Sequence, residues 1–230
     1  MYGSCRSAIP SVLSSGSRMI PTASARGNYL EWRAARAPIL FPENNHSAKA
    51  TMTTATMTTA STIKPESSEY LPYYGRYITL VPDGDVVSTL ATQVHETLTL
   101  LRGLPDSVST YRYAPDKWSV NEVVGHLIDS ERIFAVRALR FARNDVAPLP
   151  GFEQDDYVRN STFDAYSLSD LASELEVVRQ STVFLFRHMD EAAWSRRGIA
   201  SDAEVSVRAL AYIIAGHELH HREVLLSRYL

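Results

Sequence analysis

Residues 207–230 read VRALAYIIAGHELHHREVLLSRYL, and this stretch decides the fold class. Apolar positions recur every three or four residues, which is the period of an α-helix with one buried face. The residues on that face are Val207, Leu210, Ile214, His217, His221 and Val224. We expect a helix over about residues 205–228, with two histidines where a packed helix ordinarily carries aliphatic side chains.

The same helical period occurs in three stretches further upstream. The predicted helices run from Asp85 to Gly103, from Ser119 to about Arg143, and from Ser167 to His188. The second begins with the sequence SVNE, which has the serine and glutamate of a capping box. Four amphipathic helices of this length predict an all-α protein with the architecture of a four-helix bundle.

The segment between the second and third helices spans about 23 residues and contains Pro148, Pro150 and Gly151. A connection of this length is longer than expected for a bundle in which successive helices are antiparallel. The segment is expected either to cross over the bundle or to cover a site. Strand signals are weak throughout, and YITLV at Tyr77–Val81 is the best short strand candidate.

An N-terminal extension over residues 1–69 precedes the bundle, which we assign to residues 70–230. The extension is rich in Ser, Thr, Ala and Pro, and it repeats TMTTA at Thr51–Ala55 and Thr56–Ala60. Such a composition buries too little apolar surface to offset the entropy of ordering, so this segment is predicted to be disordered.

The origin of the extension has two interpretations. The first thirty residues lack acidic side chains and carry Arg6, Arg18 and Arg26, as a transit peptide would. The simpler expectation is a start codon assigned too far upstream, with Met52 or Met57 as the true start.

Composition excludes several classes of function. The 230 residues are 45% hydrophobic, which suits one globular domain with an appendage. Residues 70–230 hold 22 acidic and 16 basic side chains, so no basic face for nucleic acid is expected. No apolar run reaches the roughly 18 residues of a membrane span, and the single Cys5 excludes a cysteine zinc site. We expect a cytoplasmic protein with a small-molecule substrate.

Three histidines on inward helix faces form a candidate metal site. His217 and His221 are four residues apart, so their imidazoles lie one turn apart on one face. His126 falls on a stripe with Val123 and Ile133 in the second helix. Neutral imidazoles suit zinc, nickel, iron or copper, and a three-histidine site leaves positions for water or substrate. The alternative is that each histidine is a hydrogen-bonded core residue.

Residues 217–221 read HELHH and match the H-E-x-x-H helix of zinc proteases. The metzincin form of that motif requires a further histidine six residues after His221, where this chain has Ser227. A ferritin-like di-iron site requires Glu-x-x-His on two helices, and only Glu218–His221 has that form here. Both of these classes are therefore excluded.

The sequence resembles the DinB-like superfamily, the DinB/YfiT type of metal-binding four-helix bundle, over residues 73–230. The resemblance rests on KWSVNEVVGHLIDSERIF at Lys117–Phe134, LPGF at Leu149–Phe152 and AYIIAGHELHHREVL at Ala211–Leu225. It implies that one histidine of the second helix and a His-x-x-x-His pair of the fourth bind a divalent metal. These are His126, His217 and His221, and the family analogy also implies a homodimer.

The resemblance further implies an enzyme that transfers a low-molecular-weight thiol to a small electrophile, or isomerises it through a thiol adduct. Zinc or nickel is the expected metal, with iron as a further option. A metal-dependent hydrolase is the first alternative, in which Glu218 or Asp129 serves as general base or orients a histidine. A non-catalytic, metal-binding accessory protein of the stress or damage response is the second alternative.

Overall fold

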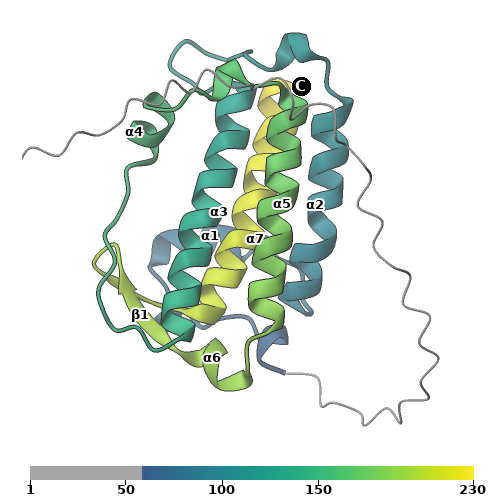
Figure 1. Cartoon of the computed structure of the whole chain (residues 1–230). Coiled ribbons are helices and arrows are strands. Elements are labelled where there is room, and N and C mark those ends of the chain that lie inside the picture. The colour runs from purple at the N-terminus through teal and green to yellow at the C-terminus, as the bar shows by residue number, and fades with distance from the viewer. Residues whose placement is uncertain (1–58) are drawn as a thin grey trace, which may run out of the picture. The chain divides into compact units, whose positions relative to one another are not determined.

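The computed structural model describes residues 59–230, in which four long helices lie side by side (Figure 1). They are α2 (Val86–Gly103), α3 (Val120–Ala142), α5 (Leu168–Arg187) and α7 (Val207–Val224). The predicted all-α four-helix bundle is therefore confirmed. Within the described residues, no helix combines the length and the hydropathy that a membrane span requires.

Each bundle helix begins at a side chain that caps its first backbone N–H groups. Asp85 accepts hydrogen bonds from the backbone of Val87 and Ser88 at the start of α2. Ser119 and Glu122 form the predicted capping box of α3. The helices α5 and α7 begin in the same way, each after a serine cap, at Ser167 and Ser206. Such caps satisfy donors that have no partner within the helix, which is why they fix where the helix begins.

The four helices do not alternate in direction along the chain. Asn121, near the start of α3, donates hydrogen bonds to the carbonyls of Phe163 and Tyr166, just before α5 begins. The starts of α3 and α5 therefore lie at the same end of the bundle, and these two helices are parallel. At that end the Tyr229 hydroxyl, which follows α7, donates to the carbonyl of Trp118. Hence α7 runs antiparallel to α3.

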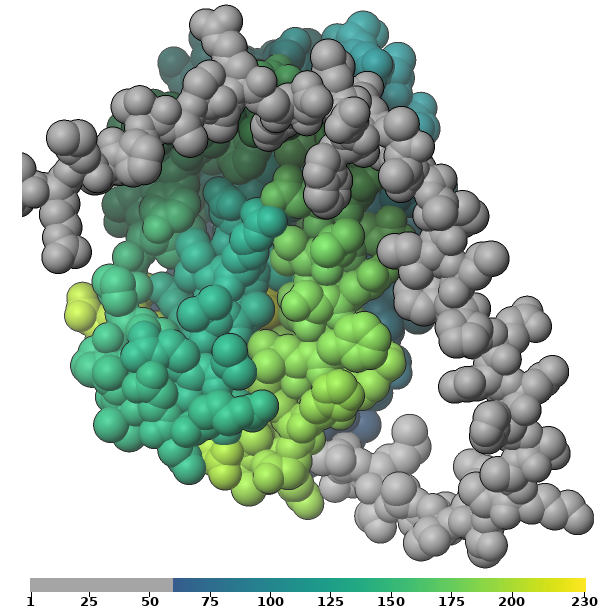
Figure 2. All heavy atoms as spheres, viewed as in Figure 1, coloured from purple at the N-terminus to yellow at the C-terminus, as the bar shows by residue number. Residues whose placement is uncertain are grey.

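Parallel neighbours require a connection that returns along the length of the bundle, and residues 143–167 provide it (Figure 1). The predicted crossover is thereby confirmed. The connection contains the short helix α4 (Gln154–Arg159). Its first part pairs with the neighbouring hairpin, because Leu149 donates to Ile199 and accepts from Ser201. Figure 2 shows this part of the connection, in teal-green, on the face of the molecule turned toward the viewer.

The remaining elements are short. They are α1 (Gly75–Ile78), α6 (Glu191–Ser195), 3-10 turns at Thr59–Thr62, Ser67–Glu69, Pro72–Tyr74, Asp106–Val108 and Phe163–Ala165, and a π-helical turn at Leu225–Tyr229. An antiparallel hairpin of β1 (Arg197–Ala200) and β2 (Ala203–Ser206) precedes α7. The last helix therefore begins at Val207 and not at the expected Val205.

Two expectations about strands were wrong. The strand candidate at Tyr77–Val81 lies partly in α1, because Tyr77 and Ile78 are buried in a helical turn. The hairpin at residues 197–206 was not expected. Its turn places Ser201 and Asp202 at positive φ (54° and 60°), without the Asn-Gly or Asp-Gly pair that usually marks such a turn.

The described structure begins at Thr59, ahead of the boundary expected at Tyr70. Residues 59–69 form two 3-10 turns, and Ala60 is buried against the bundle. Glu69 is buried as well, where its carboxylate accepts hydrogen bonds from Arg208 and Ser206. These contacts come from a distant part of the chain, so local composition does not show them. The prediction for residues 1–58 lies outside the described residues.

Helix α1 lies directly against α7 at Gly216. A Cβ atom at this position would lie 2.0 Å from the carbonyl oxygen of Tyr77, so only glycine allows the two backbones to come this close. The approach places the side chain of Tyr77 beside His217, with ring centroids 5.2 Å apart.

A buried polar layer crosses the bundle between two apolar clusters. One cluster contains Leu90, Phe134 and Leu210, and the other contains Leu98 and Leu171. The side chains of the layer are Gln93, Thr97, Glu131, Arg179 and Glu218, all of them buried.

Arg179 of α5 is the centre of this layer. It donates two hydrogen bonds of 2.9 Å to the Glu131 carboxylate on α3 and one of 2.5 Å to Glu218 on α7. It also donates to the carbonyl of Leu90 on α2 at 3.1 Å. One guanidinium thus contacts all four bundle helices. Its planar set of donors suits two carboxylates at once.

Replacing Arg179 by Met should lower the free energy of unfolding by about 3–5 kcal/mol, because two carboxylates would remain buried without their cation. Arg132→Met is the matched control. Arg132 also binds a carboxylate on another helix, Glu174, but its side chain is 49% exposed, so the loss should stay below about 1 kcal/mol. Urea unfolding of both variants measures the difference. Equal losses would contradict the role assigned to Arg179.

Candidate metal centre

The three histidines expected to bind metal lie together in the structure. His126 extends from α3, and His217 and His221 extend from α7. The Nε2 atom of His217 lies 3.1 Å from the Nε2 of His126 and 3.1 Å from that of His221. All three potential ligand atoms fall within 4.8 Å of one another.

This arrangement fits one metal ion better than it fits hydrogen bonding. The Nε2 atom of a neutral imidazole has one hydrogen or one lone pair, so His217 can form a good bond with only one of its two neighbours. Three Nε2 atoms about 2.0–2.1 Å from a common ion would lie about 2.8–3.4 Å apart at coordination angles between 90° and 109°. The two distances of 3.1 Å from His217 lie within this range, and the third pair, His126 and His221, lies within the 4.8 Å that bounds all three atoms.

The protonation state that a metal requires is favoured by burial. Burial lowers the pKa of His126 to about 4. Burial also lowers the pKa of His217 and of His221 well below the ordinary histidine value, and the charges of neighbouring histidines and of Arg76 lower both further. All three imidazoles are therefore neutral near pH 7, which is the form that binds a metal.

The groups around the imidazoles are mostly neutral. The hydroxyl of Ser130 lies 3.4 Å from Nδ1 of His126, and the Trp118 ring lies 4.7 Å from the His126 ring. Nδ1 of His221 is buried without a hydrogen-bond partner among the described residues. His220 is not part of this group, and its ring centroid lies 5.0 Å from that of His221 and 5.3 Å from that of Tyr77.

The two carboxylates proposed from the sequence as base or orienting groups do not lie against the histidines. The Glu218 carboxylate accepts hydrogen bonds from Thr97, Gln93 and Arg179 within the buried polar layer. Asp129 lies nearer the surface, 3.7 Å from Arg132. Glu218 directly follows His217 in the sequence. Successive side chains of an α-helix are rotated by about 100°, so the Glu218 side chain faces other helices.

A cavity of about 250 Å³ opens beside the histidines and has His126 and His217 in its wall. Its other lining residues are mostly aromatic or carboxylate-bearing: Tyr73, Tyr74, Tyr77, Ser130, Phe134, Phe152, Glu153, Gln154, Asp155 and Ser201. The crossover connection thus covers the site through residues 152–155. The tyrosines were not expected at the site. The aromatic run YLPYYGRY at residues 70–77 was their only signal in the sequence.

Tyr77 in this wall is hydrogen-bonded to Arg76, an exposed residue that does not itself line the cavity. The Arg76 guanidinium donates to the Tyr77 hydroxyl at 3.0 Å and lies 3.9 Å from the centre of the Tyr73 ring. Burial raises the pKa of Tyr77, so its hydroxyl remains protonated at neutral pH.

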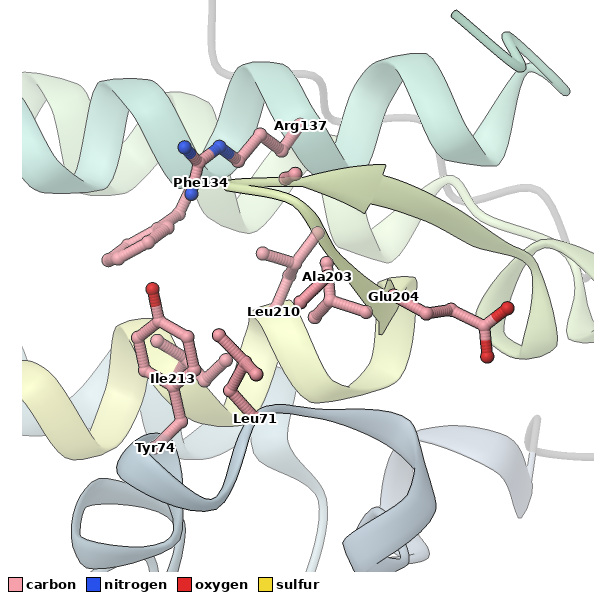
Figure 3. Close-up of a pocket in the computed structure, with 10 residues that line it drawn as sticks. Leu71, Tyr74, Phe134, Arg137, Ala203, Glu204, Leu210 and Ile213 are labelled. Carbon is pink, nitrogen blue, oxygen red and sulfur yellow. The ribbon is translucent and has the colours of Figure 1, made fainter. Parts of the chain in front are cut away.

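Arg137 lies outside the cavity lining and holds two segments next to it. It donates to the carbonyl of Pro150 in the crossover and to the hydroxyl of Ser201 in the hairpin turn. Figure 3 shows its guanidinium beside the Phe134 ring, with the Tyr74 hydroxyl directed toward both. The crossover and the hairpin are thereby attached to α3 next to the cavity.

The lowered histidine pKa values predict how the metal-free protein responds to acid. Between about pH 6.5 and pH 4 the unfolded chain binds protons that the folded chain does not, so the free energy of unfolding falls as pH falls. Each buried histidine contributes up to about 1.4 kcal/mol per pH unit. His126→Ala should reduce this slope, whereas His95→Ala, at an exposed position on α2, should not. Urea unfolding at several pH values tests this, and equal slopes in all three proteins would contradict it.

Comparison with known proteins places the chain in a family. No curated protein sequence matches it significantly. A similar solved structure is YfiT from Bacillus subtilis, described as a probable metal-dependent hydrolase with an unusual four-helix bundle topology. The two are 16% identical with a TM-score of 0.50, and the match covers 71% of this chain and 92% of that chain. The model of the DinB superfamily matches residues 89–225, which include all three histidines. The chain therefore belongs to the DinB superfamily.

Proposed function

We propose that this chain is a divalent-metal-dependent enzyme that transfers a low-molecular-weight thiol to a small electrophile, or isomerises it through a thiol adduct. The metal ligands in this proposal are His126, His217 and His221. One observation carries it: three neutral imidazole nitrogens meet at the wall of a cavity large enough for a small molecule.

The number of ligands supports an enzyme over a non-catalytic metal-binding protein. Structural zinc sites are closed by four protein ligands, whereas catalytic sites keep a position open for substrate. Among the described residues, the group that can share a metal ion consists of three histidines. Since His126 and His217 line the cavity, the open position of a bound ion would face a space accessible to substrate.

The surroundings of the histidines support a thiol as the nucleophile. A divalent ion supplies Lewis-acid chemistry that lowers the pKa of a thiol or of water. A thiol starts from a pKa near 8.5 and needs no further base, whereas water benefits from a carboxylate held beside it. The two carboxylates proposed from the sequence, Glu218 and Asp129, are directed elsewhere. The carboxylates of the cavity, Glu153 and Asp155, belong to the crossover connection and not to the helices that carry the histidines. The described residues contain no cysteine, and in this proposal the thiol comes from solution.

A metal-dependent hydrolase is the second candidate. The carboxylates of Glu153 and Asp155 line the same cavity and offer a base for an attacking water. YfiT, whose fold this chain shares, is described as a probable metal-dependent hydrolase. Imidazole ligands suit zinc or nickel, with iron as a further option, in either reaction.

The full-length protein loaded with zinc or nickel should accelerate the reaction of a small thiol with a bimane electrophile. Cysteine, glutathione and coenzyme A serve as thiol probes, and bimane fluorescence measures the rate. His217→Ala should lower the rate at least about tenfold, because the metal loses a ligand. His95→Ala, which is exposed on α2, should leave it unchanged.

Other outcomes distinguish the alternatives. Hydrolysis of nitrophenyl esters without any thiol, lost in His217→Ala, would contradict thiol transfer and support the hydrolase. Metal uptake without turnover of either kind would support a non-catalytic protein.

A further inference from the structure

The hydroxyl hydrogen of Tyr77 lacks an acceptor at an ordinary hydrogen-bond distance among the described residues. The Tyr77 hydroxyl accepts a hydrogen bond of 3.0 Å from Arg76, which leaves its O–H free to donate. The nearest acceptor is the hydroxyl of Tyr73 at 3.5 Å, longer than the 2.5–3.0 Å of an ordinary O–H···O bond. Tyr77 also lines the cavity beside His217.

We infer that the Tyr77 hydroxyl, with Arg76 donating to it from outside the cavity, forms an oxyanion-binding site, and that this hydroxyl binds a carboxylate or carbonyl oxygen of the substrate. The inference rests on the proposed function and names the substrate class of the same site. Arg76 polarises the Tyr77 hydroxyl by donating to it, and donors arranged in series strengthen one another. A hydrogen bond to a charged oxygen is about twice as strong as one to a neutral oxygen.

The position of this pair is fixed before any ligand arrives. Gly216 allows the Tyr77 backbone to contact α7, and the Tyr77 ring packs edge-on against His217 at 5.2 Å between centroids. The Arg76 guanidinium is held over the Tyr73 ring. Donors held in place in this way stabilise negative charge without reorganisation, which is the physical basis of an oxyanion hole.

The other residues of the cavity favour a ligand whose charged oxygen lies at Tyr77 and whose apolar part lies against the remaining wall. Tyr74, Phe134 and Phe152 offer aromatic surface for an apolar body. Glu153 and Asp155 lie in the same wall without an ion-pair partner among the described residues, and they disfavour an anion beside them. An oxyanion is therefore directed to the Arg76–Tyr77 side.

Ligand binding to the cobalt-loaded, full-length protein tests this inference without using turnover. Acetate is the oxyanion probe, and 1-methylimidazole is a neutral probe that can occupy the metal without needing oxyanion donors. Changes in the visible absorption of the bound cobalt measure the binding of each probe. Tyr77→Phe keeps the ring against His217 and removes only the hydroxyl. It should weaken acetate about tenfold and leave 1-methylimidazole within about twofold.

Two further variants complete the experiment. Arg76→Gln should also weaken acetate, because it removes the positive charge behind Tyr77 and shortens the side chain that donates to it. Tyr111→Phe removes a hydroxyl from an exposed tyrosine outside the cavity and should change neither affinity.

The outcomes separate this inference from the proposed function. A parent protein that takes up no cobalt overturns both. A parent that binds cobalt but not acetate overturns the inference alone, as does a Tyr77→Phe variant that binds acetate as tightly as the parent. Equal weakening of both probes in Tyr77→Phe also overturns it, because it would indicate a disturbed metal site.

Discussion

The ion pair of Arg179 with Glu131 and Glu218 is the contact on which the geometry of the site depends. Arg179 contacts all four bundle helices from inside the bundle, where a misplaced carboxylate would be left without its cation. Glu131 lies five residues after His126 on α3, and Glu218 directly follows His217 on α7. Fixing both carboxylates therefore fixes the rotation of α3 and α7, which brings the imidazoles together on the adjacent face.

The directions of the helices determine which other segments of the chain reach the site. Because α3 and α5 are parallel, the chain between them must return along the bundle, and it brings residues 152–155 to the histidines. Gly216 in turn admits α1, which brings Tyr77 and, just before it, Tyr73 and Tyr74 to the cavity. The cavity is thus enclosed by segments outside the four helices. The histidines contribute the potential metal ligands, and these added segments contribute most of the other groups that line the cavity.

Interactions between residues close in the sequence were enough to predict most of the fold and the grouping of the three histidines. Helix starts were predictable because a cap such as Ser119 binds backbone only two or three residues away, and His217 and His221 share a face by spacing alone. The missed features depend on distant partners. Tyr77 is helical because it packs on α7, and Glu218 is directed to Arg179 and not to the histidines. Neither partner is visible from the neighbouring sequence.

Anomalous diffraction from zinc-soaked crystals, recorded on both sides of the zinc edge, tests the central claim most directly. The account predicts one strong peak about 2.0–2.2 Å from Nε2 of His126, His217 and His221, with no fourth protein ligand and an open side toward the cavity. Absence of a peak between the three histidines would contradict the account. A peak closed by a fourth side chain would contradict the catalytic role.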